Sequence, residues 1–176
     1  MPKAEECQAD FKCSIKNYRE ICFDGKWFAI SYKNRYNQGM EIIARTREET
    51  IAAAEHFAKK LEGGDVVLLS GELGAGKTTF TKGIAHALGV KEQVTSPTFT
   101  IIKEYTGETL RLYHMDMYRL SGDITELGLE EYLGKKDGVT VIEWCAIGDI
   151  HARVYAVSLE YYGEGRKIVF SDPMER

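Results

Sequence analysis

The sequence lacks several features that would place the protein in a well-marked class. It has no apolar run near the roughly 20 residues that a membrane helix needs, and its first residues lack the apolar core of a secretory signal. These absences predict a cytoplasmic protein with no membrane partner. The 176 residues are 44% hydrophobic and 28% charged, which is typical of a globular chain with one main domain.

Paired cysteine motifs are also missing. The four cysteines are Cys7, Cys13, Cys22 and Cys145, and no two of them form a C-x-x-C motif. A zinc site built from the first three would need further ligands. Free thiols in a reducing compartment are therefore the favoured interpretation.

The main part of the chain lacks the basic character that a nucleic-acid-binding protein usually shows. Residues 1–39 hold seven Lys or Arg and five Asp or Glu, whereas residues 40–176 hold 16 and 22, a net charge of −6. We therefore expect no DNA partner. A role in RNA chemistry would run through a protein partner.

Residues 1–39 are predicted to be an appendage of unknown role ahead of a domain that spans residues 40–176. Seven aromatic residues in this appendage argue against a disordered tail. The run 26–32 favours a strand after a turn at Asp24-Gly25, and Met40 offers an alternative start.

The most informative segment is 71–78, Gly-Glu-Leu-Gly-Ala-Gly-Lys-Thr, a complete match to the phosphate-binding pattern G-x-x-x-x-G-K-[ST]. Glycines let backbone N–H groups wrap round an anion, Lys77 can reach the β- and γ-phosphates, and the Thr78 hydroxyl can bind Mg²⁺. The apolar run 65–70 predicts a buried strand before the loop, and the spacing of apolar residues after it predicts a helix. This order favours a nucleotide site over a glycine-rich turn that binds nothing.

The rest of the chain predicts an α/β domain of the P-loop NTPase type, with a central, mainly parallel sheet flanked by antiparallel edge hairpins and helices. Thr46 and Glu49 form a capping box that opens a helix over 48–61. A helical stretch is predicted over 123–133. Strands are expected at 41–44, after a turn at 96–97 up to residue 105, at 110–116, at 139–144, and as an antiparallel pair at 155–161 and 166–170.

Two carboxylates are candidates for the chemistry beyond the loop. Glu143 ends a buried strand, where such enzymes place an acid that serves Mg²⁺ or its water shell. Asp116 lies at the end of the strand predicted over 110–116, so it is either a helix cap or ion-pair partner of Arg119 or a group that faces the γ-phosphate. His114 alone is more typical of a structural histidine, and Trp144 is more typical of core than of a base-stacking platform.

Thr98 lies about twenty residues after the loop, where switch segments of these enzymes commonly lie. Its alternative is a plain proline turn. No Asn-Lys-x-Asp guanine motif is present, which leaves GTP unsupported and favours ATP. Arginines are few after the loop, which disfavours a nucleotide kinase.

Four motifs in order, residues 71–80, 96–99, 114–120 and 142–144, resemble those of the TsaE (YjeE) family. The resemblance covers about residues 40–170. It implies a Mg²⁺-dependent ATPase, weak alone and stimulated by its partners, that is required for threonylcarbamoylation of adenosine 37 in tRNAs reading ANN codons. It further implies action through the TsaB and TsaD proteins, with tRNA reached through that complex.

The resemblance also assigns roles to residues. Lys77, Asp116 and Glu143 are the expected catalytic residues, with Thr78 and Glu143 at the metal. The expected nucleotide-binding residues are Thr46, Glu72, Leu73, Gly74, Ala75, Gly76, Lys77, Thr78, Thr79, Thr98, Asp116 and Arg166. A small kinase that transfers the γ-phosphate, and a binding module with negligible turnover, remain the alternatives.

Overall fold

The computed structural model describes residues 18–23, 26–31, 40–119, 128–144, 150–171 and 173. The chain divides into two compact units, residues 1–36 and 37–176. In the first, strands β1 (Tyr18–Phe23) and β2 (Lys26–Ser31) form an antiparallel hairpin. The strand predicted over 26–32 is confirmed over Lys26–Ser31, and residue 32 lies outside the described residues. The predicted turn at Asp24-Gly25 lies outside the described residues, as do Cys7, Cys13 and Cys145. That residues 1–39 form an appendage of unknown role stays a prediction.

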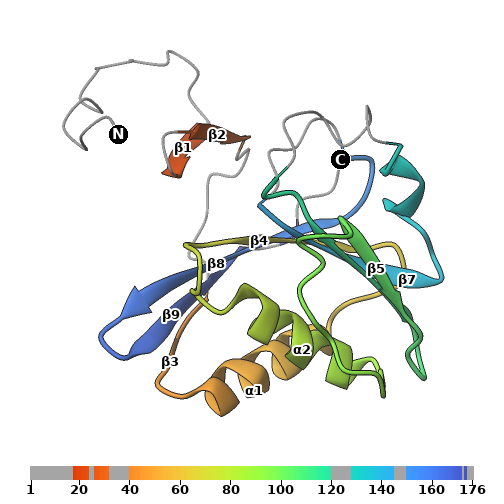
Figure 1. Ribbon diagram of the computed structural model, residues 1–176, viewed down its shortest axis with the longest axis horizontal. Helices are drawn as coiled ribbons and strands as arrows, with labels where there is room; N and C mark the ends of the chain where they lie inside the picture. The colour runs from red at the N-terminus through yellow and green to blue at the C-terminus, as the bar shows by residue number, and fades with distance from the viewer. Residues whose placement is uncertain are drawn as a thin grey trace. The chain divides into compact units, whose positions relative to one another are not determined.

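The second unit contains a seven-stranded sheet in the order β3-β9-β8-β4-β7-β6-β5 (Figure 1). The neighbouring strands β8, β4, β7 and β6 run parallel, and the remaining pairings are antiparallel. The predicted α/β fold with a parallel centre and antiparallel edges is therefore confirmed. The strands are β3 (Glu41–Ala44), β4 (Val66–Ser70), β5 (Ile102–Tyr105), β6 (Arg111–Asp116), β7 (Gly138–Glu143), β8 (Val154–Tyr162) and β9 (Gly165–Phe170).

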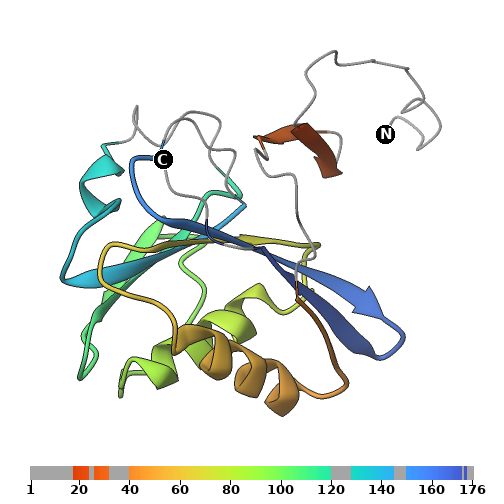
Figure 2. The same ribbon diagram turned by 180° about the vertical axis from the view of Figure 1, so that it is seen from behind.

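Helices α1 (Arg47–Ala58) and α2 (Lys77–Ala87) lie on the same face of this sheet (Figures 1 and 2). The Thr46 hydroxyl caps α1 by accepting from the Glu49 N–H at 3.1 Å, and the Glu49 carboxylate accepts from the Arg45 N–H at 2.6 Å. The predicted start is thus confirmed, but the predicted end at Leu61 is wrong. The N–H groups of residues 60 and 61 bond to carbonyls three residues back, which tightens the chain out of α-helical geometry after Ala58.

The core between the helices and the sheet is aromatic. The Phe57 ring lies with its centroid 5.8 Å from that of Phe80, 5.5 Å from Tyr155 and 5.3 Å from Phe170. The two helices approach closely at Gly83, where an added Cβ would lie 2.5 Å from the Ile51 carbonyl oxygen. Packing of this kind holds the start of α2, and with it the loop before it, against the sheet.

A second apolar cluster, on β4, β6, β7 and β8, includes Val66, Met115, Ile142 and Val154. The predicted helix over 123–133 is wrong where it can be compared. Residues 123–127 lie outside the described part, while Gly128 has a φ of 66° and only Glu130–Tyr132 form a short 3₁₀ helix, η1. The N–H groups of Tyr132 and Leu133 bond to carbonyls three residues back, and the Tyr132 carbonyl accepts from the Thr140 hydroxyl at 2.6 Å.

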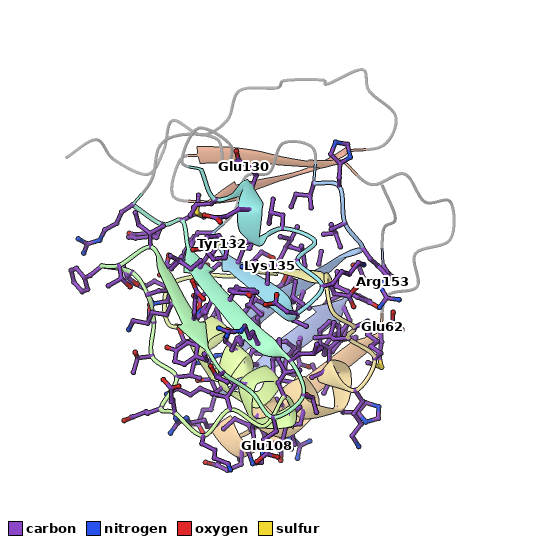
Figure 3. All side chains as sticks on the ribbon, turned by 90° about the vertical axis from the view of Figure 1, so that its right-hand side faces the viewer. Glu62, Glu108, Glu130, Tyr132, Lys135 and Arg153 are labelled. Atoms are coloured by element: carbon purple, nitrogen blue, oxygen red, sulfur yellow. The ribbon has the colours of Figure 1, made fainter. Side chains whose placement is uncertain are left out.

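An ion pair ties the start of β8 to the connection between α1 and β4. The Arg153 guanidinium makes two hydrogen bonds of 2.8 Å to Asp65 and an ion pair of 3.2 Å to Glu62 (Figure 3). The hydrogen bonds to Asp65 raise the pKa of Arg153 above its ordinary value. No helix among the described ranges is long and apolar enough to cross a membrane.

Candidate nucleotide-binding site

The loop 71–76 joins β4 to α2 and has the backbone of a phosphate-binding loop. Gly71, Gly74 and Gly76 have φ angles of 141°, 78° and 104°, in the region that favours glycine. At Gly71 an added Cβ would also lie 2.3 Å from the Leu159 carbonyl oxygen. The motif glycines are therefore required by the fold of the loop as well as by access for a ligand.

The end of the β8–β9 hairpin holds this loop from the side. The Arg166 guanidinium donates to the carbonyls of Ala75 at 2.9 Å and Gly74 at 3.2 Å. The Tyr161 hydroxyl donates to the Leu73 carbonyl at 3.0 Å, and its ring lies 4.3 Å from the guanidinium. Three consecutive loop carbonyls are thus fixed by two side chains.

The two predicted carboxylates meet beside the loop. Asp116 and Glu143 are register partners at the carboxyl ends of β6 and β7, and Glu143 also pairs with Leu69 at the end of β4. Both are almost fully buried, with exposures of 5% and 3%. The ends of these parallel strands therefore place both acids beside the loop that follows β4. The carboxyl edge of parallel strands is also where open α/β sheets bind ligands.

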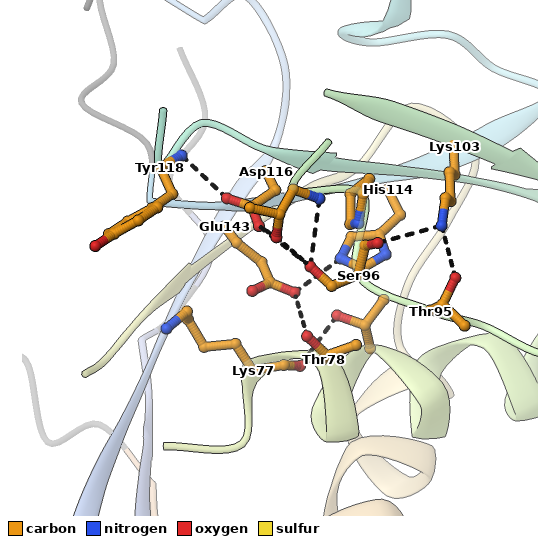
Figure 4. A network of polar contacts seen from close by, with 12 residues as sticks. Lys77, Thr78, Thr95, Ser96, Lys103, His114, Asp116, Tyr118 and Glu143 are labelled. Carbon is orange, nitrogen blue, oxygen red and sulfur yellow. Dashed lines mark hydrogen bonds and ion pairs between the residues drawn. The ribbon is translucent and has the colours of Figure 1, made fainter. Parts of the chain in front are cut away.

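Glu143 lies between the loop helix and β6 (Figure 4). Its Oε1 accepts from the Thr78 hydroxyl at 3.1 Å and from His114 Nε2 at 2.8 Å. The Thr78 hydroxyl gives its one proton to this bond and keeps its lone pairs for another partner. The structure thus places the two predicted metal residues in direct contact, while their role at a metal stays a prediction.

Asp116 is the centre of a second set of contacts, to the segment before β5 (Figure 4). Its Oδ2 accepts from the Thr98 hydroxyl at 2.5 Å and from the Ser96 hydroxyl at 3.3 Å. Its Oδ1 accepts from the Tyr118 N–H at 3.0 Å. Thr98 is thus attached directly to the carboxylate at the loop, through a turn that sequence reasoning had left open as a plain proline turn.

That turn is built by two backbone bonds. The N–H groups of Thr100 and Ile101 both donate to the Pro97 carbonyl at 2.8 Å, and Ile101 has a φ of 68°. For this reason β5 begins only at Ile102.

Lys77 points back onto its own loop. Its ammonium donates to the carbonyls of Gly71 at 2.7 Å and Glu72 at 3.0 Å, and it lies 3.8 Å from the centre of the Trp144 ring. Burial lowers the pKa of Lys77, while the charges of Glu143 and Asp116 act in the opposite direction. A phosphate ligand would add the negative charge that favours the ammonium form.

Thr46 and His114 complete the residues considered from the sequence, and the predicted nucleotide contact of Thr46 stays a prediction. Thr46 caps α1, and it follows the β3 residue Ala44, which is the register partner of Arg166. It therefore starts α1 near the hairpin side of the loop. His114 was interpreted as structural, although Asp116 on the same strand has the same parity and β-strand side chains alternate between faces. That parity was the available signal that His114 faces the site.

The donor set suits a metal that arrives with a nucleotide. Within the described ranges, no three His, Cys, Asp or Glu side chains gather into a metal cage. Mg²⁺ in nucleotide sites keeps waters and is held by one or two protein groups plus phosphates. The Thr78 hydroxyl and the Glu143 carboxylate fit that requirement.

Comparison with known proteins agrees with these observations. Residues 44–168 match the family described as threonylcarbamoyl adenosine biosynthesis protein TsaE. A protein named tRNA threonylcarbamoyladenosine biosynthesis protein TsaE from Bacillus subtilis is 55% identical over 97 residues, which are 55% of this chain and 61% of that protein. Proteins of the same name are 45% identical in Treponema pallidum, over 60% of this chain and 78% of the relative, and 36% identical in a Nostoc strain, over 73% and 82%.

A solved structure shows the same fold. The crystal structure of Bacillus subtilis YdiB superposes with a TM-score of 0.65 at 37% identity, covering 78% of this chain and 88% of that one. The resemblance predicted from four sequence motifs is confirmed by the family match, and the chain belongs to the TsaE family of threonylcarbamoyl adenosine biosynthesis proteins.

Proposed function

We propose that this protein binds and hydrolyses ATP with Mg²⁺ in the biosynthesis of tRNA threonylcarbamoyladenosine. The observation that carries the proposal is the meeting of Lys77, Thr78, Asp116 and Glu143 at one end of the sheet. In phosphoryl transfer, proteins contribute mainly positioning and electrostatic stabilisation. Each of these side chains supplies one part of that contribution.

In this proposal Lys77 leaves the loop carbonyls and contacts the β- and γ-phosphates. Thr78 would hold Mg²⁺ with its free lone pairs while it keeps its bond to Glu143, which would serve the water shell. When bound, Mg²⁺ neutralises charge on the phosphate oxygens. Asp116 would orient the attacking water beside the γ-phosphate.

Thr98 would couple the binding of the nucleotide to a movement at the protein surface. Its hydroxyl now donates to Asp116, so a ligand that engages Asp116 competes for the same bond. The turn that carries Thr98 also carries Phe99, whose side chain is 84% exposed. Loss of the bond between Thr98 and Asp116 would therefore move the exposed Phe99, as in order–disorder switches of nucleoside triphosphatases.

We propose TsaB and TsaD as the partners, with tRNA reached through them. Leu73 of the loop is 74% exposed, and Phe99 lies on the turn that carries Thr98. A protein that covers these two apolar side chains would therefore contact both segments beside the nucleotide. The acidic composition of residues 40–176 also favours protein contact over direct contact with RNA.

The test is ATP hydrolysis with and without the TsaB–TsaD pair and tRNA. Stimulation by the full set is expected. Lys77→Ala should weaken ATP binding, whereas Glu143→Ala and Asp116→Ala should mainly lower turnover. Wild-type stimulated rates in both carboxylate variants would contradict the assigned roles.

Labelled ATP separates the proposal from its alternatives. Release of free phosphate supports hydrolysis, and transfer of label to a small-molecule acceptor would support a kinase. Nucleotide-dependent binding of partners with no turnover under any condition would support a binding module instead.

A further inference from the structure

We propose that His114 is a positioning residue for Glu143. It holds one carboxylate oxygen, so that the other would stay available to the water shell of a bound Mg²⁺. The inference rests on the proposed nucleotide site, and it gives a function to a residue whose sequence context alone is more typical of a structural histidine.

The His114 imidazole is fully buried in β6, at 0% exposure. Its Nε2 lies 2.8 Å from Glu143 Oε1. Its Nδ1 has no hydrogen-bond partner among the described residues. A carboxylate only accepts, so Nε2 carries the proton and donates to Oε1.

A purely structural histidine would be expected to satisfy its buried polar atoms. Here one ring nitrogen is left unpaired, at a cost in stability, while the other is used on a single carboxylate oxygen. An apolar side chain of similar size would avoid that cost. The unpaired Nδ1 is explained if the role of His114 is to donate to Glu143.

The geometry at Glu143 shows what the bond accomplishes. Oε1 receives two donors, one from the loop helix and one from β6, so the carboxylate is held from two directions. Oε2 has no donor from His114 or Thr78. Without His114 the carboxylate would lose the shorter of these two bonds, and the nearby Lys77 ammonium would draw it out of place.

The test compares three substitutions of His114. His114→Gln keeps an N–H donor near the position of Nε2. His114→Asn is polar but too short to reach Glu143, and His114→Leu is apolar. Met115→Leu is the matched control, because Met115 is equally buried on the same strand but belongs to the cluster on the other face of the sheet.

Three quantities are measured for each variant: the melting temperature, the dissociation constant of ATP with and without Mg²⁺, and kcat in the presence of TsaB, TsaD and tRNA. Partners that orient metal-site ligands typically contribute about 10- to 100-fold in metal affinity or activity. We expect His114→Leu and His114→Asn to lose about that factor in kcat and in the gain of ATP affinity on adding Mg²⁺. ATP affinity without Mg²⁺ should stay close to wild type, and His114→Gln should recover most of the loss.

The Mg²⁺ effect on ATP binding requires no turnover, so it tests His114 even if the wild-type protein proves not to hydrolyse ATP. Absence of wild-type hydrolysis would overturn the proposed function alone. Equal Mg²⁺ effects in wild type, His114→Leu and His114→Asn would overturn the positioning role, and so would a His114→Gln variant that melts like wild type but shows the same loss as His114→Leu. If His114→Leu does not fold, His114→Asn and His114→Gln carry the comparison.

Discussion

The Arg166 side chain offers a sharp test of how the phosphate loop is held. The resemblance to the TsaE family implies a nucleotide-binding arginine, whereas in the structure the guanidinium donates to the carbonyls of Gly74 and Ala75. Arg166→Ala removes both bonds. If the loop contacts are its main role, the variant should weaken every ligand that needs the loop.

The magnitude follows from those two bonds. A hydrogen bond from a charged group contributes about 1.5–3 kcal/mol, so two such bonds would contribute about 3–6 kcal/mol. Solvent screening at the partly exposed Arg166 reduces this to about half, about 1.5–3 kcal/mol in total. Affinity changes tenfold for about 1.4 kcal/mol. If this energy maintains the binding-competent loop, the dissociation constant should rise about 10- to 100-fold.

Calorimetric titration with pyrophosphate, ADP and ATP is the assay. Loss of loop order predicts a similar factor for all three ligands, because each uses the loop amides. Arg111→Ala is the control, since it also removes one positive charge. Arg111 lies at the start of β6, at the end of that strand away from Asp116, where it pairs with Glu104 and Asp137. Wild-type affinity of Arg166→Ala for pyrophosphate, with weakened ATP binding, would refute the reasoning and assign Arg166 to the nucleoside.

Three further predictions concern stability. Phe57→Ala empties the centre of the aromatic core and should cost about 3–5 kcal/mol in urea unfolding; a loss below about 1 kcal/mol would contradict its central place. Gly83→Ala should lower the melting temperature despite the better helix propensity of alanine, because the new methyl would lie 2.5 Å from the Ile51 carbonyl oxygen; an unchanged or higher value would show that the helices can separate freely. Burial and the hydrogen bond to Asp137 raise the pKa of Tyr113 to about 12. The folded protein therefore keeps this proton while the unfolded chain loses it near pH 10. This contribution to stability is complete below about pH 10 and is lost as the pH rises through 12, so Tyr113→Phe should flatten the stability profile in that range.

The sequence predicted the parts of the site that depend on local patterns. The loop motif identified Lys77 and Thr78 because glycine conformations and phosphate contacts need those residue types at that spacing. The buried run before Glu143 identified a strand that ends at the site. Alternating segments around short turns likewise predicted the antiparallel edges of the sheet.

What the sequence could not supply was the partner of each side chain across the sheet. His114 acquires its role from Glu143, which lies 29 positions later and reaches it only through the register of β6 and β7. The sequence favours core for Trp144, and the side chain does pack against the second apolar cluster. Sequence alone does not predict that its ring also lies 3.8 Å from the Lys77 ammonium. Its φ of 60°, at the end of β7, is also one that no local preference of tryptophan predicts.

The helical stretch expected over 123–133 failed for a related reason. Its apolar spacing fits a helix, but Gly128 has a φ of 66° and only Glu130–Tyr132 form η1 among the described residues after it. The Tyr132 carbonyl at the end of η1 accepts from the Thr140 hydroxyl of β7. Helix propensity is a weak prior, and tertiary contacts of this kind override it.

The strand order has a consequence for how the protein is made. β4, which leads into the loop, has no neighbour in the sheet that is close in sequence: its partners are β7 and β8, whose residues follow some 70 to 90 positions later. During synthesis the loop therefore emerges from the ribosome long before the strands that fix it, and contacts between distant segments form slowly. A nascent chain that stops before β8 has the complete phosphate-binding motif but not the sheet that holds it in shape. The nucleotide binding proposed for this loop would thus be a late product of folding, acquired only when most of the chain has been made.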